Sequence, residues 1–397
     1  MKKGKHLMQL LFLASIVSVC SSCVSSTNQE QNTEDNFVVE TLQPVSVTGE
    51  DTFETAQSAA DNFISGWNLG NTLDSTGKWI SGGTAAYETA WGNVVTTQEI
   101  INTVKDAGFN AIRLPVTWEF HIDKNGNVNK AWMKRVHQVV DYVINQDMYC
   151  ILNVHHDRWV SAYQESYEKN SAKFATLWTD IANEFKDYGE KLLFESTNEM
   201  LDKEQNWGGT SENNYKVLNN WNQLFVNSVR LTGGKNYCRN LVTMTYAGSS
   251  DSKIMDAFVL PKDVVENHLM LEVHNYDPQA FCWSDATWTK MTAVWDEERF
   301  SSDLISTFNR MQSYATKLNV PIIIGEWGSV KKLLPNSTEY NDEERAKHAE
   351  FFISETVKRN IKCFWWDCGD FALIDRKVPE QIHKPVINAI ITAANKK

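Results

Sequence analysis

Two glutamates in this chain follow short apolar runs that are typical of buried strands. Glu199 lies just beyond the run Leu192–Glu195, and Glu326 comes directly after the run Ile322–Gly325. Two carboxyl groups facing one bond can hydrolyse a glycosidic linkage, and about 5–5.5 Å separates them when the anomeric configuration is retained. One carboxyl must hold a proton near neutral pH while the other stays ionised, so their surroundings must differ. The pair therefore predicts glycoside hydrolysis with retention.

Polar and aromatic residues also stand at the ends of most other apolar runs. Asn198 can hold a sugar hydroxyl, and Tyr276 and Arg113 can keep Glu326 ionised by donating hydrogen bonds or positive charge to it. Convergence of such residues on one rim is hard to explain by packing alone. The full set is Asn68, Asn71, Arg113, His155, His156, Asn198, Glu199, His274, Tyr276, Glu326, Trp365 and Trp366.

The set contains two pairs of neighbouring residues of the same type, Trp365 with Trp366 and His155 with His156. Neighbouring side chains on an extended strand point to opposite faces. Of Trp365 and Trp366, one should face the substrate as a stacking surface and the other should pack in the core. His155 and His156 should likewise point apart, which places them badly for binding one ion together. No HxxxH motif accompanies them, so we expect no metal, and we expect hydrogen bonding to sugar or carboxylate instead.

The elements that must position these residues are eight strands separated by amphipathic helices. Near-continuous apolar strands indicate a parallel sheet buried on both faces, and eight such strands predict a closed (β/α)8 barrel whose site lies at the carboxyl ends of the strands. An open doubly wound sheet is the alternative, but no glycine-rich phosphate loop follows the first strand. The predicted strands are 66–69, 110–115, 149–154, 191–195, 241–246, 268–273, 321–325 and 361–366. The predicted helices are 98–107, 132–146, 173–188, 214–230, 303–317 and 342–359.

The net charge of the chain bears on which kind of molecule it binds. The chain has 397 residues and a formal net charge of −12. Nucleic-acid binding needs clustered Lys and Arg, so the acidic balance argues against it and is compatible with an uncharged substrate.

The first residues indicate export. A basic start with Lys2, Lys3 and Lys5 precedes the apolar run 7–19, which is too short for a stable membrane span and is typical of a signal peptide. Cys23, after Ser22, resembles the lipidated cysteine of a bacterial lipoprotein, and plain secretion is the alternative. We therefore expect a signal peptide over residues 1–23, a flexible polar tether over 24–57 and one catalytic domain over 58–397. A surface or periplasmic lipoprotein with a lipid anchor is the expected location.

Seven segments together resemble glycoside hydrolase family 5 (cellulase family A), and within it the endo-β-1,4-glucanase and xyloglucanase subfamily 4. The resemblance covers nearly the whole chain after the tether, and the segments occur in family order. They are GWNLGNTLD (66–74), IRLPVTW (112–118), LNVHHD (152–157), FESTNE (194–199), VHNYDP (273–278), IIIGEWG (322–328) and FWWDCGD (364–370).

The resemblance implies Glu199 as the acid/base and Glu326 as the nucleophile, with no cofactor. It implies a surrounding group made of Arg113, His155, Asn198, His274, Tyr276 and Trp366. It also implies that Asn71, Asp74 and His156 hold the sugar on the non-reducing side. The chain departs from the family pattern at Met200, where Pro is usual, and at Cys368, where Asn is common. Neither departure removes a reacting group, but Cys368 alters the contacts near the cleaved bond.

The expected function is a monomeric retaining endo-β-1,4-glucanase acting on cellulose, mixed-linkage β-glucan or xyloglucan. A β-mannanase or xylanase on the same barrel is the nearest alternative, because the reacting residues are shared. A non-catalytic glycan-binding lipoprotein is the alternative of another class, but a binder has no need for both glutamates.

Overall fold

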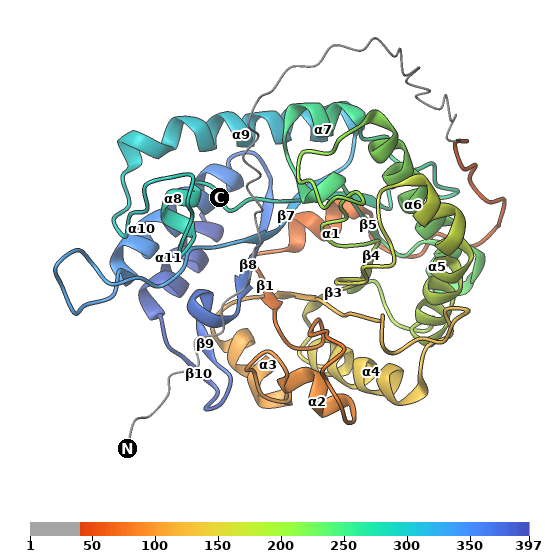
Figure 1. Cartoon of the computed structure of the whole chain (residues 1–397), viewed down its shortest axis with the longest axis horizontal. Helices are drawn as coiled ribbons and strands as arrows, with labels where there is room; N and C mark the ends of the chain where they lie inside the picture. Colours follow the sequence, from red (N-terminus) through yellow and green to blue (C-terminus); the bar gives the residue numbers. More distant parts are fainter. Residues whose placement is uncertain (1–39, 397) are drawn as a thin grey trace, which may run out of the picture. The chain divides into compact units, whose positions relative to one another are not determined.

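The computed structural model describes residues 40–396, in which eight parallel strands close into one barrel (Figure 1). Each strand pairs with its neighbour in chain order, and the last strand pairs with the first. The predicted (β/α)8 barrel is confirmed, and every predicted strand lies within two residues of an observed one. The strands are β1 (Gly66–Leu69), β2 (Ala111–Leu114), β3 (Tyr149–Asn153), β4 (Leu192–Glu195), β5 (Leu241–Met244), β6 (Leu269–His274), β7 (Ile322–Trp327) and β8 (Lys362–Asp367).

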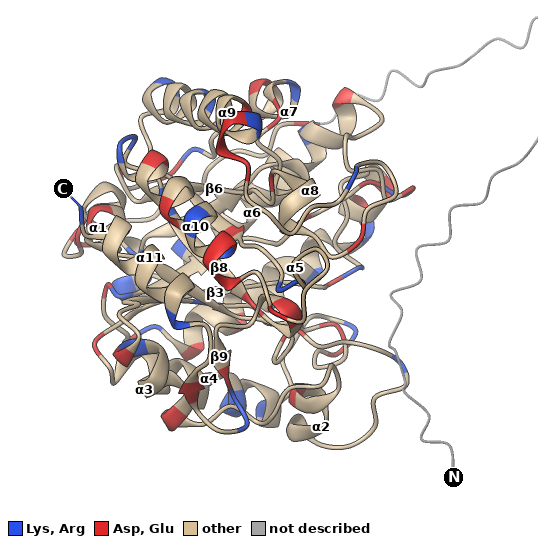
Figure 2. Ribbon diagram, turned by 90° about the vertical axis from the view of Figure 1, so that its left-hand side faces the viewer, with Lys and Arg blue, Asp and Glu red and all other residues tan. Residues whose placement is uncertain are grey.

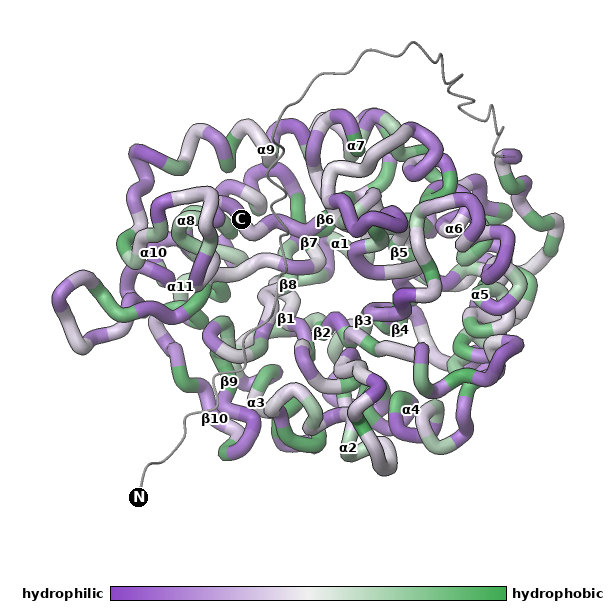
Figure 3. Tube along the Cα trace, viewed as in Figure 1, coloured by the Kyte–Doolittle hydropathy of each residue, from purple (hydrophilic) through white to green (hydrophobic). Residues whose placement is uncertain are grey.

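Helices surround the barrel, and their hydrophilic and hydrophobic residues alternate along the chain (Figure 3). Capping side chains define some of their ends: Asn129 and Asp296 accept hydrogen bonds from first-turn N–H groups of α4 and α9. Basic and acidic residues are interspersed on the outer helices (Figure 2). The helices are α1 (Ala56–Asn62), α2 (Thr84–Thr89), α3 (Gln98–Asp106), α4 (Lys130–Ile144), α5 (Gln164–Glu184), α6 (Glu212–Leu231), α7 (Ser252–Ala257), α8 (Gln279–Cys282), α9 (Glu297–Leu318), α10 (Asp342–Val357) and α11 (Lys384–Ala394).

Inward-facing residues fill the barrel in layers, because side chains on a strand alternate between its two faces. One layer is apolar and packs as a buried cluster that includes Ala111, Ile151, Leu193, Met270, Ile323 and Phe364. Two residues further along the same strands, the next layer is polar and charged, with Asn68, Arg113, Asn153, Glu195 and Glu272, all buried. The barrel interior thus changes from apolar to charged between positions that are two residues apart along each strand.

The short helix α1 closes the end of the barrel at which the strands begin. Thr55 caps it by accepting a hydrogen bond from the N–H of Ser58, and the N–H of Ala56 donates to the carbonyl of Asn267. Phe63, which follows α1, packs edge-on against Phe364 with ring centroids 5.5 Å apart. We call this the closed end, and the opposite end the mouth.

The chain before α1 lies against the barrel and is not a free tether from residue 40 onward. Asn220 of α6 exchanges hydrogen bonds with the backbone of Glu40 and Leu42, and Asn227 does the same with Gln43 and Val45. These amides satisfy the extended backbone, so residues 40–57 join the barrel domain and the predicted boundary at 58 is wrong for them. The predicted signal peptide, Cys23 and the tether up to residue 39 lie outside the described residues. No helix within residues 40–396 has the length and apolar character that crossing a membrane requires.

Candidate active site

An irregularity in the strand pairing brings the nucleophile candidate to the mouth. Val273 of β6 pairs with Ile324 of β7, but the next residue, His274, pairs with Glu326, so Gly325 is an extra residue in β7. Such a bulge re-aims the side chains that follow it. Glu326 therefore stands opposite His274 at the carboxyl ends of the strands, where barrel enzymes carry their chemistry.

Glu326 is held by donors on both carboxylate oxygens. Arg113 Nη1 lies 2.8 Å from its Oε1, and the hydroxyl of Tyr276 donates to its Oε2 at 3.0 Å. Its side chain is only 7% exposed. Burial raises the pKa of Glu326, and the positive charges of His274 and Arg113 oppose that rise. The predicted contacts from Arg113 and Tyr276 are confirmed.

Glu199 has one main partner and much more access to solvent. His274 Nδ1 lies 2.7 Å from its Oε1, and 24% of the Glu199 side chain is exposed. Carboxylate oxygens of Glu199 and Glu326 lie within 4.8 Å of each other and of the His274 ring. This separation fits the retaining geometry of about 5–5.5 Å between the two carboxyl groups.

Arg113 sits at the centre of a buried web that connects the site to the barrel interior. Its guanidinium donates to both oxygens of Glu195 at 2.7 Å and to Oδ1 of Asn198 at 2.9 Å, and Nε lies 3.0 Å from Glu272. Sequence reasoning placed Arg113 and Asn198 here but missed the two buried glutamates. The signal that could have found them is the two-residue period, since Glu272 precedes His274 by one such step.

The two adjacent histidines do not point apart, so that prediction is wrong. Their ring centroids are 4.4 Å apart, because both residues lie beyond the end of β3, where strict alternation no longer holds. His155 Nε2 lies 4.0 Å from Glu326, and His156 Nε2 lies 3.9 Å from Asp74. The pair therefore connects the nucleophile candidate to the loop after β1.

Asp74 orders that loop from a fully buried position. It accepts hydrogen bonds from the backbone N–H groups of Thr72 and Asn71, at 2.6 and 3.0 Å. Asn71 has a left-handed backbone with φ of 56°, which Asn tolerates better than most residues. Burial raises the pKa of Asp74 to about 7, although these backbone donors oppose the rise. Asn71, Asp74 and His156 thus lie together, and their implied role in holding the sugar on the non-reducing side stays a prediction.

The two tryptophans of β8 divide as predicted. Trp365 is fully buried and packs edge-on against Trp327, while Trp366 is partly exposed and lies parallel to the His155 ring at 5.9 Å. The indole N–H of Trp366 donates to the sulfur of Cys368 at 3.0 Å. Cys368 therefore orients the flat ring that faces the site.

Within residues 40–396, two groups of side chains bring three ligand-type atoms within 4.8 Å of one another, a spacing that a metal ion could bridge: Asp74 with His155 and His156, and Glu199 with His274 and Glu326. Their atoms already have other partners. Both ring nitrogens of His274 contact carboxylates, and Asp74 accepts two backbone N–H groups. The expected absence of a metal stays a prediction.

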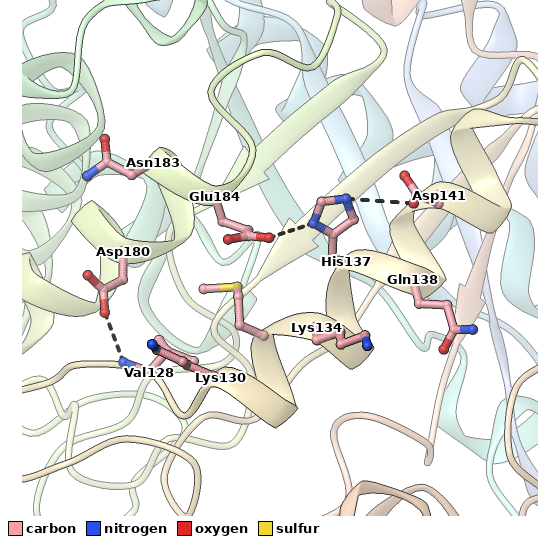
Figure 4. Close-up of a pocket in the computed structure, with 10 residues that line it drawn as sticks. Val128, Lys130, Lys134, His137, Gln138, Asp141, Asp180, Asn183 and Glu184 are labelled. Carbon is pink, nitrogen blue, oxygen red and sulfur yellow. Dashed lines mark hydrogen bonds and ion pairs between the residues drawn. The ribbon is translucent and has the colours of Figure 1, made fainter.

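A separate groove of about 790 Å³ lies on the outside of the barrel between α4 and α5 (Figure 4). Its floor carries His137, whose Nδ1 contacts Glu184 at 2.6 Å and whose Nε2 lies 3.6 Å from Asp141. These side chains are one-third to nearly one-half exposed, so water screens the ion pairs. The groove contains none of the predicted site residues.

Comparison with known proteins finds glycoside hydrolases, the class of enzyme that the two carboxyl groups indicate. A family model described as cellulase (glycosyl hydrolase family 5) matches residues 73–372. Endoglucanase A of Clostridium longisporum is 39% identical over 308 residues, which are 76% of this chain but only 57% of that relative. A Prevotella bryantii B14 family 5 enzyme, solved with a xyloglucan tetradecasaccharide, has 37% identity and a TM-score of 0.79 over 87% of this chain and 100% of its own.

A second solved relative is a broad-specificity GH5-4 endoglucanase from Ruminococcus champanellensis with bound cellotriose. It has 35% identity and a TM-score of 0.79, and the match covers 87% of this chain and 100% of that one. The family model includes both Glu199 and Glu326. The chain is a member of glycosyl hydrolase family 5 and resembles the endoglucanases of its subfamily 4.

Proposed function

We propose that the protein is a retaining endo-β-1,4-glucanase. One observation carries this proposal: Glu199 and Glu326 approach within 4.8 Å while having different surroundings. Glu326 receives donors from a guanidinium and a phenol, which stabilise the carboxylate form that attacks, and Glu199 is open enough for the water that the second step uses. Solved relatives with xyloglucan or cellotriose bound support a β-glucan backbone as substrate.

The reaction takes two steps on opposite faces of the sugar: Glu326 attacks the face away from the leaving oxygen, and water later attacks the face that the leaving group has vacated. In the first, the Glu326 carboxylate bonds to the anomeric carbon while the bond to the leaving oxygen breaks and Glu199 gives its proton to that oxygen. In the second, Glu199 takes a proton from water, the water oxygen bonds to the anomeric carbon and Glu326 is released. Arg113 and Tyr276 hold the Glu326 oxygens, so the nucleophile needs little reorganisation before attack.

Two partly exposed tryptophans beside the site support binding of a substrate that extends over several sugar residues. The Trp91 ring lies 5.4 Å from that of His156, and the Trp283 ring lies 5.5 Å from that of Tyr276. Flat indole faces bind the apolar faces of sugar rings. An enzyme that binds several sugar residues on both sides of the cleaved bond can hydrolyse internal bonds of a polysaccharide.

Reducing-sugar release from a panel tests the proposal. The panel contains carboxymethyl cellulose, barley β-glucan, xyloglucan, glucomannan and xylan, with wild type and Glu326→Gln side by side. We expect release from at least one glucan, with a rapid fall in polymer length, and loss of release in the variant. Release only from glucomannan or xylan would favour the mannanase or xylanase alternative. Binding without release would favour the non-catalytic glycan binder.

We also propose that the chain is exported as a monomeric lipoprotein, on the basis of the basic start, the apolar run 7–19 and Cys23. Growth of an expressing bacterium with radiolabelled palmitate tests the anchor. We expect label in wild type and in a Cys20→Ser control but not in Cys23→Ser. Unlabelled wild type recovered from the medium would favour plain secretion instead.

A further inference from the structure

Glu272 is a buried carboxylate that faces both cations of the site through a single oxygen. Its Oε1 lies 3.0 Å from Arg113 Nε and 3.2 Å from His274 Nε2, and its side chain is fully buried. Its Oε2 has no hydrogen-bond partner among the described residues. A carboxylate kept for packing alone would be expected to satisfy both oxygens, because an unpartnered buried oxygen costs stability. The placement of Glu272 therefore serves the two cations.

The extra residue of β7 makes room for this carboxylate. A Cβ atom added to Gly325 would lie 1.6 Å from Glu272 Oε1 and 2.2 Å from its carboxyl carbon. The space beside the Gly325 backbone is thus occupied by Glu272, and any side chain there would push the carboxylate away from Arg113 and His274. Glu272 can therefore occupy its position only because residue 325 is a glycine.

His274 links this carboxylate to the acid/base candidate. Its Nε2 contacts Glu272 and its Nδ1 contacts Glu199, so the ring can donate to both carboxyl groups only when it carries two protons. We propose that Glu272 is a positioning residue for the reaction: it fixes the His274 ring as a double donor, so that Nδ1–H holds one oxygen of Glu199 and directs the other toward the leaving group. This inference rests on the proposed function.

The electrostatics of the ring support the proposal. The titratable groups that face His274 are Glu199 beyond β4, Glu326 on β7, Glu272 on its own strand and His155 beyond β3. Burial alone would lower the pKa of His274, but the carboxylates of Glu326, Glu199 and Glu272 raise it to about 10. The ring is therefore an imidazolium through the neutral range, with two N–H groups to donate.

A leaving-group comparison separates this role from a general structural one. Phenyl β-cellobioside needs a proton from Glu199 as its bond breaks, whereas 2,4-dinitrophenyl β-cellobioside leaves without one. If Glu272 acts through His274 on Glu199, Glu272→Gln will lower kcat/KM for the phenyl substrate by roughly tenfold to a hundredfold and for the dinitrophenyl substrate by roughly threefold or less.

Glu88→Gln is the matched control. Glu88 is also a fully buried glutamate paired with an arginine, Arg135 at 2.6 Å, but it lies on α2 outside the site. We expect it to leave the ratio of the two rates unchanged. Glu272→Met serves if the Gln variant does not fold, since other carboxylates around Arg113 and His274 still balance their charge.

Equal loss on both substrates, or no loss on either, in folded Glu272→Gln would overturn the positioning role. A wild-type enzyme inactive on both cellobiosides and on every glucan would instead overturn the proposed function, so the two failures are distinguishable. Correct folding is checked by the thermal midpoint of each variant.

Discussion

The closed end and the mouth of this barrel are built by the same strands, two residues apart. At the closed end, Ile151, Met270 and Phe364 pack with α1 in a cluster without charged side chains. At the mouth, Asn153, Glu272 and Trp366 take the equivalent positions, and Arg113 binds three carboxylates. Apolar burial stabilises the fold, whereas buried ions rarely repay their desolvation. The difference indicates that the apolar closed end stabilises the fold. The buried charges at the mouth lower the free energy of unfolding but position the reacting groups.

The strongest way to sharpen this comparison is Glu326→Gln. We expect kcat on the best glucan to fall by roughly a thousandfold or more, because the nucleophile is lost. We expect the thermal midpoint to stay equal or rise, because burial of this carboxylate raises its pKa and is therefore unfavourable to its ionised form. Steady-state kinetics and thermal unfolding of the purified variant measure the two quantities. A lower midpoint would contradict the division between the ends.

Arg113→Met should damage both properties at once. It leaves Glu195, Glu272 and Glu326 without their shared cation, and breaking a buried ion pair costs about 3–5 kcal/mol. Urea unfolding measures the stability, and glucan hydrolysis by the remaining folded protein measures activity. Wild-type stability with lost activity would show that the ionic web contributes nothing to folding.

Phe364→Ala is the counterpart at the closed end. Removing this fully buried ring should lower the free energy of unfolding by about 3–5 kcal/mol and leave kcat/KM of the folded enzyme within roughly twofold of wild type. Urea unfolding and active-site titration before kinetics separate the two effects. A large fall in kcat/KM would show that the closed end also positions the reacting groups.

The smallest expected effect concerns pH. Because the pKa of buried Asp74 is raised to about 7, the folded state binds its proton more tightly than the unfolded chain does, so this group favours folding at low pH. That contribution declines as pH rises from about 4 through 7. Asp74→Asn should therefore flatten part of the stability loss between about pH 4 and 7, as measured by the urea midpoint at each pH. An unchanged slope would place Asp74 as an ordinary ionised carboxylate.

Much of this fold was predictable from the sequence, for a physical reason. Strands buried on both faces need continuous apolar runs, and these runs marked all eight strands and the ends where Glu199 and Glu326 stand. The alternation of Trp365 and Trp366 was predictable because both lie within β8. Local periodicity is valid wherever the backbone stays regular.

The failures lie where the backbone is irregular or contacts are remote in sequence. His155 and His156 lie past the end of β3, so alternation gave the wrong facing. Residues 40–57 are polar enough to suggest a tether, but the amides that bind them lie on α6, about 180 residues away. Glu272 resembled an ordinary strand residue, because its partners Arg113 and Gly325 come from β2 and β7.

Asn68 has a consequence for the order in which this enzyme assembles. Its side-chain amide donates to the carbonyls of Gly325, Phe364 and Trp365, and its oxygen accepts from Arg113. These partners join β1 to strands nearly 300 residues later, so the contact forms only when the first and last strands meet, and such long loops close slowly. Arg113 gains its full set of partners only at that moment. Recovery of hydrolysis during refolding should therefore report closure of the barrel, and a partly closed intermediate should be inactive.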